Sequence, residues 1–405
     1  MKPQQSPKQR PKRMRALWPV PMVTLSLAAT GLAGACTSHA AVEPDAPAPT
    51  ARNAAAACVD KVFGAMTGPQ RVGQLFMGGV SPSKPDPRKI QLMRRYHVGA
   101  VFLAGRSNAG TTANRAFVDG LQAKADTAAG RRVPLLVSTD QEGGRVQVLS
   151  GPGFSAMPSA LVQGGWSTSY LRGRAAVWAR QLRAAGVNLN LAPVADVVPA
   201  ALGRSNAPIG RYDREFGHTA AAVTPHSDAF AAGMAQSKVL ATLKHFPGLG
   251  NVRGNTDTTA DVVDSVTTRT SSSLAPFRSG IKAGAPLVMV SSATYSRIDP
   301  AHRAVFSSAV IQDLLRKDFG FKGVVISDDL GRAVAVQAVP PADRAVDFLS
   351  AGGDLVLTVE PDLIPAMADA VRTRMAQNAA FRARVDQSVH RVLTAKQQEG
   401  LLTCG

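Results

Sequence analysis

The stretch "VLATLKHF", residues 239–246, is a short apolar run that ends in a lysine and a histidine. Seven more runs along the chain are similar, in that apolar residues follow one another with little alternation with polar residues. Runs of this kind are typical of strands that are buried on both faces, as in a parallel sheet. The seven are "VGQLFMGG" (72–79), "VGAVFLAG" (98–105), "VPLLVSTD" (133–140), "VNLNLAPVADV" (187–197), "PLVMVSSA" (286–293), "GVVISDDL" (323–330) and "GDLVLTV" (353–359).

Longer segments with helical periodicity lie between these runs. One extends from Ser169 to Ala185, where apolar residues recur every three or four positions, and another from about Ser308 to Phe319, with Gly320 in the C-cap position. Eight strand-then-helix units most simply close into a single (β/α)8 barrel of the TIM type, an α/β fold. A doubly wound open sheet is the alternative that this pattern leaves open. No internal repeat or interdomain linker follows residue 58.

A barrel of this type carries its chemistry at the carboxyl ends of its strands. Polar residues do follow the apolar runs, where those ends are expected. The clusters are Asp140-Gln141-Glu142, Asp196, Lys244-His245, Ser291-Ser292 and Ser327-Asp328-Asp329. The sequence therefore predicts a charged site at one end of the barrel.

The N-terminal residues differ in composition from the rest of the chain. The first eighteen hold six Lys or Arg and no acid, and an apolar segment follows from Pro19 to Leu32, which is the layout of a signal peptide. That segment is too short for a permanent transmembrane helix, which needs about 20 apolar residues. It ends in "LAGAC", which resembles the lipobox of bacterial lipoproteins and implies that Cys36 is acylated. Ordinary cleavage near Ala35 or Ala40 is the alternative.

We therefore expect three parts, namely a signal peptide (1–35), an Ala/Pro-rich tether (36–57) and one barrel domain (58–405). The mature protein is expected outside the cell, either anchored by lipid to the outer face of the cell membrane or secreted, and as a monomer. In that oxidising compartment, Cys58 and Cys404 are left over at opposite ends of the folded region and are expected to form a disulfide.

The chain is basic, with a formal net charge of +18 that would fall to +12 if the six N-terminal Lys and Arg were removed. The charges are scattered and no aromatic-basic motif accompanies them, so no nucleic-acid partner is expected. Two interpretations of the remaining charge stay open. It could attract anionic wall polymers or lipid head groups, or it could be an ordinary solvated surface.

Five segments in one order resemble signatures of the family 3 glycoside hydrolases, and in particular of their single-domain β-N-acetylglucosaminidases. The resemblance covers roughly residues 72 to 396, and the lipobox-like N-terminus is similar to that of an actinobacterial lipoprotein branch. It implies a glycosidase that uses no metal and no organic cofactor. The segments are "STDQEGGRV" (138–146), "AAGVNLNLAPVADV" (184–197), "KHFPG" (244–248), "LLRKDFGFKGVVISDDL" (314–330) and "RVDQSVHRVL" (384–393).

The resemblance assigns Asp328 as the catalytic nucleophile. Retaining glycosidases need a carboxylate close below the anomeric carbon, and Asp328 follows the apolar run "GVVIS". An aspartate after a strand is also a common helix N-cap. Two adjacent aspartates allow both roles, with Asp329 or Ser327 as the cap and Asp328 as the nucleophile.

The resemblance also assigns the residues that bind the sugar. Asp140 would accept hydrogen bonds from hydroxyls at the far end of the pyranose ring, and Lys244 and His245 would donate to the same sugar, because charge-assisted hydrogen bonds are strong. The alternative, a satisfied core pair, requires partners for a buried lysine. Arg214, in "IGRYDREFG" (209–217), would be a further ligand, although two extra residues precede it.

Other polar residues of these motifs are expected to be structural. Glu142 and Arg145 are interpreted as salt-bridge partners in a Gly-rich turn, and Asp196 as a residue that pins a barrel loop. Val148 stands where the family commonly has another sugar-binding arginine, so one contact is missing or supplied elsewhere.

The loop after "KHFPG" departs from the family pattern. Better-known relatives carry a histidine as the acid/base there, oriented by an aspartate, whereas this chain has Asn255, Thr256 and Asp257 at the matching positions. Asp257 is the candidate acid/base, provided that burial or the field of Asp328 keeps it protonated. Two alternatives stay open. Asp257 could cap a turn with Thr258 and Thr259, leaving a slow or inactive enzyme, or another residue could donate the proton.

The predicted function is exo-acting, retaining hydrolysis of terminal β-linked N-acetylglucosamine from peptidoglycan-derived fragments, in cell-wall turnover. The expected partners are fragments that contain N-acetylglucosamine, together with the membrane through the lipid anchor. One alternative keeps the fold and changes the reaction to that of a β-glucosidase or an N-acetylglucosaminide phosphorylase. Another is a wall-sugar-binding lipoprotein that has lost turnover through Asn255 and Asp257.

Overall fold

The structure is a computed structural model that describes residues 49–404. The predicted signal peptide and Cys36 lie outside these residues, as does most of the predicted tether. None of the helices among residues 49–404 combines the length and the apolar composition of a transmembrane span.

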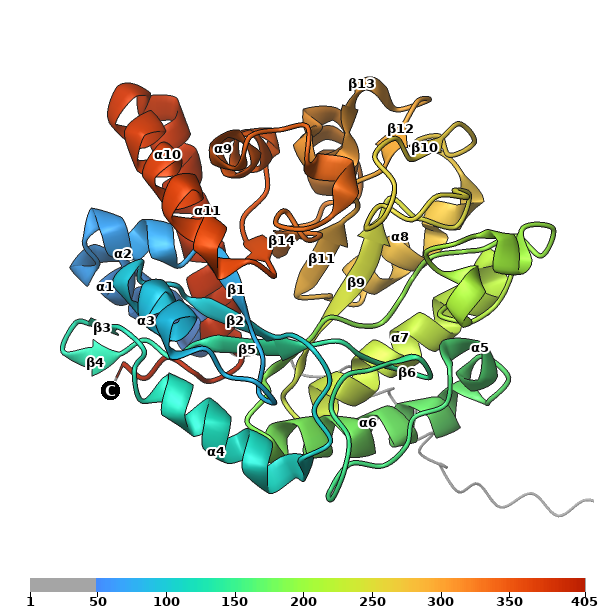
Figure 1. The fold of residues 1–405 in the computed structure, drawn as a ribbon, viewed down its shortest axis with the longest axis horizontal. Helices are drawn as coiled ribbons and strands as arrows, with labels where there is room; N and C mark the ends of the chain where they lie inside the picture. Colours follow the sequence, from blue (N-terminus) through green and yellow to red (C-terminus); the bar gives the residue numbers. More distant parts are fainter. Residues whose placement is uncertain (1–48, 405) are drawn as a thin grey trace, which may run out of the picture. The chain divides into compact units, whose positions relative to one another are not determined.

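Eight parallel strands form a closed barrel, as predicted, and the open-sheet alternative is wrong (Figure 1). Their hydrogen-bonded order follows the chain, and the circle closes where the Ser327 amide donates to the Leu355 carbonyl at 3.0 Å. Each strand lies within a predicted apolar run or extends one residue beyond it. The strands are β1 (Phe76–Val80), β2 (Ala100–Leu103), β5 (Leu136–Thr139), β8 (Leu189–Asn190), β9 (Leu240–Phe246), β11 (Leu287–Val290), β14 (Val324–Ser327) and β15 (Val356–Thr358).

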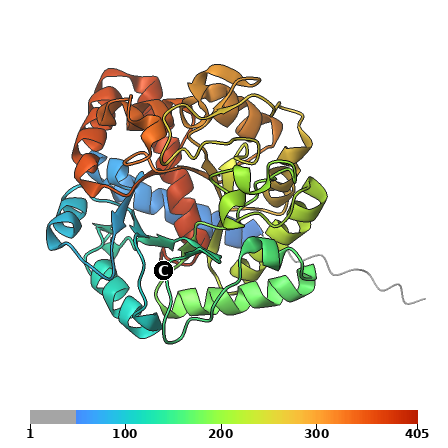
Figure 2. The ribbon, with the colours of Figure 1, turned by 45° about the vertical axis from the view of Figure 1, so that its right-hand side comes forward.

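Helices form a layer around the strands (Figures 1 and 2). The helix predicted at 169–185 is α6, and the one predicted at 308–319 is the π-helical segment η5, after which Gly320 has a φ of +69°. The outer elements are α3 (Pro87–Arg95), α4 (Gly110–Gln122), α6 (Thr168–Ala184), α7 (Ala220–Gln236), α8 (Ala275–Lys282), η5 (Ala309–Asp318), α9 (Pro341–Ala351), α10 (Ile364–Gln377) and α11 (Ala379–Gln398).

Short helices and strands lie in the loops of the barrel and in the residues before β1. The helices are α2 (Gly68–Gly73), α5 (Ala160–Gln163), η1 (Gly203–Ser205), η2 (Gly210–Tyr212), η3 (Ser272–Leu274), η4 (Ala304–Phe306), η6 (Val334–Val336) and η7 (Pro361–Leu363). The strands are β3 (Thr127–Ala128), β4 (Arg131–Arg132), β6 (Gln141–Gly143), β7 (Val146–Gln147), β10 (Val263–Asp264), β12 (Thr294–Tyr295) and β13 (Asp299–Arg303).

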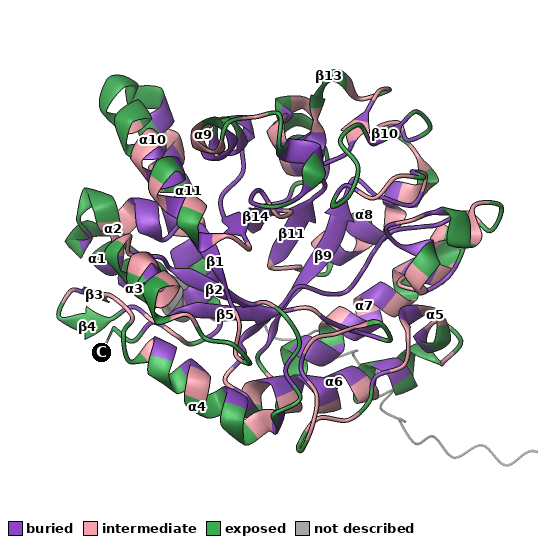
Figure 3. Cartoon of the chain, viewed as in Figure 1, coloured by how far each residue is buried: buried purple, intermediate pink, exposed green. Residues whose placement is uncertain are grey.

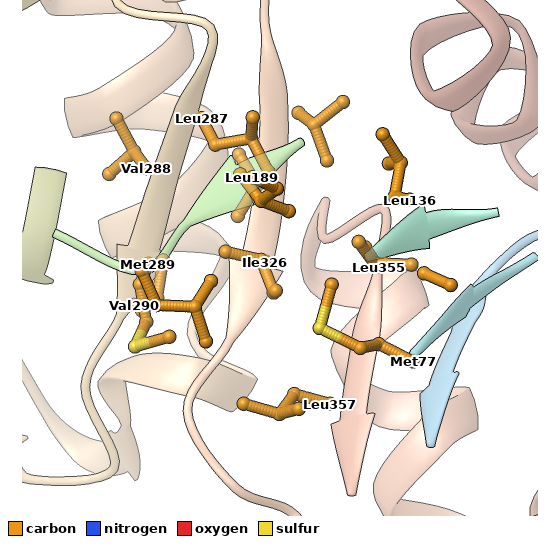
Figure 4. Packing of buried hydrophobic residues seen from close by; sticks show 14 of the residues in the cluster. Met77, Leu136, Leu189, Leu287, Val288, Met289, Val290, Ile326, Leu355 and Leu357 are labelled. Carbon is orange, nitrogen blue, oxygen red and sulfur yellow. The ribbon is translucent and has the colours of Figure 1, made fainter. Parts of the chain in front are cut away.

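The barrel interior is a packed apolar core. Figure 4 shows Met77, Leu136, Leu189, Ile326 and Leu355 projecting from different strands into the same space, and none of the five is measurably exposed. Figure 3 shows the same division along the helices, which are buried toward the strands and exposed outside. The core therefore explains why the strand sequences are apolar without alternation.

The boundary predicted between tether and barrel domain is wrong by nine residues. Helix α1 (Pro49–Ala65) begins inside the segment predicted as a tether, so residues 49–57 are helical. The Ala-rich run in this segment has high intrinsic helix propensity, which the tether prediction underweighted. Helix α1 packs against α11, and a disulfide joins Cys58 to Cys404.

Candidate active site

A buried ion network lies at the carboxyl ends of β5 and β9. The Lys244 ammonium lies 2.6 Å from a carboxylate oxygen of Asp140 and 2.6 Å from one of Glu142. Burial alone would lower the pKa of Lys244, but these two carboxylates raise it above its ordinary value. Lys244 is therefore a buried cation with two anionic partners. These partners offset the free-energy cost of burying a charged lysine.

Glu142 joins Lys244 to Arg214. The Arg214 guanidinium donates two hydrogen bonds to the Glu142 carboxylate, at 2.8 and 2.7 Å. Burial acts to raise the pKa of Glu142, but the charges of Arg214 and Lys244 outweigh it and hold this pKa at about 2. Glu142 is structural, as predicted, but its predicted partner is wrong. Arg145 is exposed and forms no ion pair with a described residue, because the turn directs its side chain to solvent.

His245 is oriented from behind by Asp196. The Asp196 carboxylate lies 2.7 Å from His245 Nδ1 and also accepts from the backbone N–H groups of His245 and Leu249, at 3.1 and 2.8 Å. A proton on Nδ1 donates to Asp196 and leaves Nε2 on the pocket side, 3.5 Å from an Arg214 nitrogen. Asp196 thus holds the loop after β9, as its sequence position indicated.

Asn206 helps to build the site, although no sequence motif indicated this role. It is fully buried, and its Nδ2 lies within hydrogen-bond distance of the carbonyls of Leu249, Gly250 and Val252, at 2.7, 3.1 and 2.8 Å. Its Oδ1 accepts from the backbone N–H groups of Ile209 and Gly210. One amide therefore ties the loop that carries Arg214 to the loop that carries Asp257.

Asp328 and Asp329, at the end of β14, have different environments. Asp329 accepts from three backbone N–H groups, those of Gly331, Arg332 and Val359, at 2.8, 2.9 and 3.0 Å. Asp329 is thus the residue that caps the turn. Asp328 accepts only from the N–H of Asp329, at 2.8 Å, and its other oxygen is available to the pocket.

The pKa of Asp328 is raised to about 6. Burial at the bottom of the pocket is the main cause; His245 opposes it, and the nearby negative charge of Asp257 adds to it. A carboxyl with this pKa is mostly ionised at neutral pH, as a nucleophile must be.

The loop after β9 carries Asp257 to the pocket wall. Asn255 caps the turn, since its side-chain oxygen accepts from the Asp257 N–H at 3.0 Å and its carbonyl accepts from the Thr258 N–H at 3.0 Å. The Asp257 carbonyl accepts from the Val334 N–H at 3.3 Å. The Asp257 carboxylate itself is exposed and has no hydrogen bond or ion pair with a described residue. Asn255, and not Asp257, is therefore the residue whose side chain caps this turn.

These groups surround one pocket of about 600 Å³ at the mouth of the barrel. Its lining includes Asp140, Arg214, Lys244, His245, Asp257 and Asp328. All six residues predicted for the site thus lie around one cavity. Arg332 and Val334, which the sequence did not single out, line the wall beside Asp257. No cluster of potential metal ligands occurs among residues 49–404.

A closed parallel barrel with carboxylates around a charged pocket at its carboxyl end has the architecture of a barrel glycoside hydrolase. Residues 69–395 match the family model described as "Glycosyl hydrolase family 3 N terminal domain", and the chain belongs to glycosyl hydrolase family 3.

Named relatives agree with this assignment. A β-hexosaminidase of Xylella fastidiosa (strain M23) is 38% identical over 78% of this chain and 92% of its own. The crystal structure of the β-N-acetylhexosaminidase from Beutenbergia cavernae DSM 12333 is similar with a TM-score of 0.80 and 49% identity, covering 82% of this chain and 99% of that one. A glycoside hydrolase family 3 β-N-acetylglucosaminidase from Paenibacillus sp. str. FPU-7 is similar with a TM-score of 0.74 and 30% identity, covering 84% and 64%.

Proposed function

We propose that the protein is an exo-acting, retaining β-N-acetylglucosaminidase that releases terminal β-linked N-acetylglucosamine from peptidoglycan-derived fragments. We further propose that it acts outside the cell, held at the membrane by lipid on Cys36. The names of the Beutenbergia and Xylella relatives support the sugar. The observation that carries the reaction is that Asp328 shares one pocket with the ion pair of Asp140 and Lys244 and with the free carboxylate of Asp257.

The charged residues of the pocket suit the terminal sugar. Asp140 has acceptor capacity beyond its bond to Lys244, and its side chain is 25% exposed toward the pocket. Arg214 and His245 present nitrogen atoms beside it. Because Glu142 and Asp196 hold these groups from behind, they keep their positions without substrate, which is the preorganisation that strengthens sugar binding. Fixed charges that line the pocket suit the binding of a terminal sugar, which supports exo action.

The reaction needs two steps. Asp328 attacks the anomeric carbon and forms a glycosyl ester while Asp257 gives its proton to the departing oxygen. Asp257 then removes a proton from water, whose oxygen attacks the anomeric carbon and releases Asp328. Asp257 is exposed and lines the pocket, so its carboxyl can reach the oxygen of a bound leaving group.

The test is a panel of aryl β-glycosides, with and without inorganic phosphate, using the full chain and an Asp328→Asn control. We expect aryl release from the N-acetylglucosaminide without phosphate and none from the control. Release only with phosphate would identify a phosphorylase, and preference for the glucoside would identify a β-glucosidase. Saturable binding of N-acetylglucosamine without release from any glycoside would establish the non-catalytic binder.

A further inference from the structure

The face of the barrel opposite the pocket carries a set of exposed cations. In a closed parallel barrel, every connection from a helix to the next strand lies at the amino ends of the strands, away from the pocket. Exposed Lys and Arg lie in these connections or in the last turns of the helices that precede them, and we consider seven of them. We call them the basic face: Arg94, Arg95, Lys124, Arg132, Lys238, Lys282 and Lys322.

Two pairs of these cations lie near one another at that end of the barrel. Arg94 and Lys124 line the same surface hollow. Lys238 and Lys322 line two hollows that share residues 284–286 as a common border, beside the end of α11. The fold therefore brings members of the basic face together in pairs, although they are far apart in sequence.

Acidic residues of the same connections do not offset this charge, because each already has a partner. Asp126 accepts from His97 at 2.8 Å, and Glu399 is buried against Arg183 at 2.7 Å. The others are Asp318, paired with Arg269, and Asp354, which is buried with Arg316, Arg384 and Arg391. In contrast, the following members of the basic face form no ion pair with a described residue: Arg94, Arg95, Lys124, Lys282 and Lys322.

Helix-dipole complementarity explains only part of this distribution. Arg94, Arg95 and Lys282 lie in the last turns of α3 and α8, where a cation is favoured by the negative end of the helix dipole. Lys322 lies four residues beyond the end of η5, and the dipole effect decays within one turn. Its exposure without an ion-pair partner among the described residues indicates an external one.

We propose that the basic face docks on an anionic phospholipid bilayer. Charge complementarity favours this partner, because anionic head groups attract clustered Lys and Arg near the membrane surface. Helix α1, which lies C-terminal to the basic and apolar N-terminal segment in the chain, packs against β3 and α11 at this same end. Docking in this orientation turns the pocket away from the bilayer, toward soluble or wall-bound substrates.

The test compares two variants with equal loss of charge, both made in the full chain with Cys36→Ser so that acylation makes no contribution. The first removes four cations of the basic face, through Lys124→Gln, Lys238→Gln, Lys282→Gln and Lys322→Gln. The matched control removes four exposed cations from loops at the pocket end, through Lys84→Gln, Arg211→Gln, Arg253→Gln and Arg297→Gln. Co-sedimentation is measured with vesicles of phosphatidylcholine mixed with phosphatidylglycerol, and with phosphatidylcholine alone.

At low salt we expect the first variant to bind the anionic vesicles about a hundredfold more weakly than the parent, and the control to bind nearly as well as the parent. Binding to phosphatidylcholine alone should be weak and equal for all three. Equal losses in both variants, or no loss in either, would overturn the proposal. Tighter binding of the basic face to soluble polyphosphate than to vesicles would also overturn it, in favour of a polymer partner.

Hydrogen exchange provides a measurement that does not depend on the variants. In the Cys36→Ser chain, anionic vesicles should slow amide exchange in residues 123–135 and 282–286, and not in the Asp257 loop, residues 250–268. Protection of the pocket end instead would refute the orientation. None of these readouts uses glycosidase activity, so the proposal stands or falls separately from the proposed function.

Discussion

Replacing Asp257 by alanine tests which group gives the proton to the leaving oxygen. The substitution removes a carboxylate that has no hydrogen bond or ion pair with a described residue. The backbone bonds of the turn, from the Asp257 N–H to Asn255 Oδ1 and from the Val334 N–H to the Asp257 carbonyl, remain possible in the variant. The free energy of unfolding should therefore change by no more than about 0.5 kcal/mol.

The kinetic effect should depend on the leaving group. General acid catalysis contributes about 10²–10⁴-fold when the leaving oxygen needs a proton, which corresponds to about 3–5 kcal/mol of barrier. A nitrophenyl glycoside needs little protonation, so its glycosylation rate should fall by less than about tenfold. A disaccharide substrate should lose the full factor. Added azide should restore part of the nitrophenyl turnover, because azide attacks the glycosyl ester without a general base.

The assay is kcat/KM of Asp257→Ala for a series of aryl and alkyl N-acetylglucosaminides, plotted against the pKa of the leaving group. Asn255→Ala is the matched control, because it removes the side chain that caps the turn and keeps the carboxylate. A slope that steepens only in Asp257→Ala supports the proton-donor role. The reasoning is refuted if Asp257→Ala slows every substrate equally and azide gives no rescue, since Asp257 would then only shape the loop.

Further predictions concern the nucleophile, the ion network and the chain ends. Asp328→Asn should abolish turnover with unchanged circular dichroism. A 2-fluoro glycoside should label Asp328 in the wild type, and labelling of Asp329 instead would make Asp329 the nucleophile. Because attack needs ionised Asp328, whose pKa is raised to about 6, kcat/KM should fall about tenfold per pH unit below about pH 6, and a flat profile down to pH 4 would contradict this. Glu142→Gln should lower the free energy of unfolding in urea by about 3–5 kcal/mol, because it leaves buried cations, including Lys244, without a full partner. The pKa of Glu142 is depressed on folding, so its stabilisation is present above about pH 4.3 and is lost as pH falls through about 2; the Gln variant should lack this dependence. Reducing the bond between Cys58 and Cys404 should lower stability by about 2–4 kcal/mol, and detection of two free thiols in exported, unreduced protein would disprove the bond.

Much of the fold was predictable because it depends on local patterns. A strand buried on both faces must be apolar throughout, so each apolar run marked a barrel strand. The site followed from the same patterns, because polar residues directly after such runs, such as Asp140, Lys244 and Asp328, can only lie at the carboxyl ends of the strands. The start of α1 was missed because a short Ala-rich segment has the composition of both a tether and a helix.

Six side chains of the pocket were predicted from the sequence and its motifs, whereas the groups that surround them depend on contacts between distant segments. Glu142 pairs with Arg214 and Lys244, which are 72 and 102 positions away, and no local pattern predicts a contact over that distance. The same limit applies to Asn206, whose one amide joins two loops. It applies as well to the basic face, because residues scattered along the chain share a surface only after the barrel closes. Strand periodicity is a local property, whereas electrostatic partners and surface charge depend on which distant segments come together.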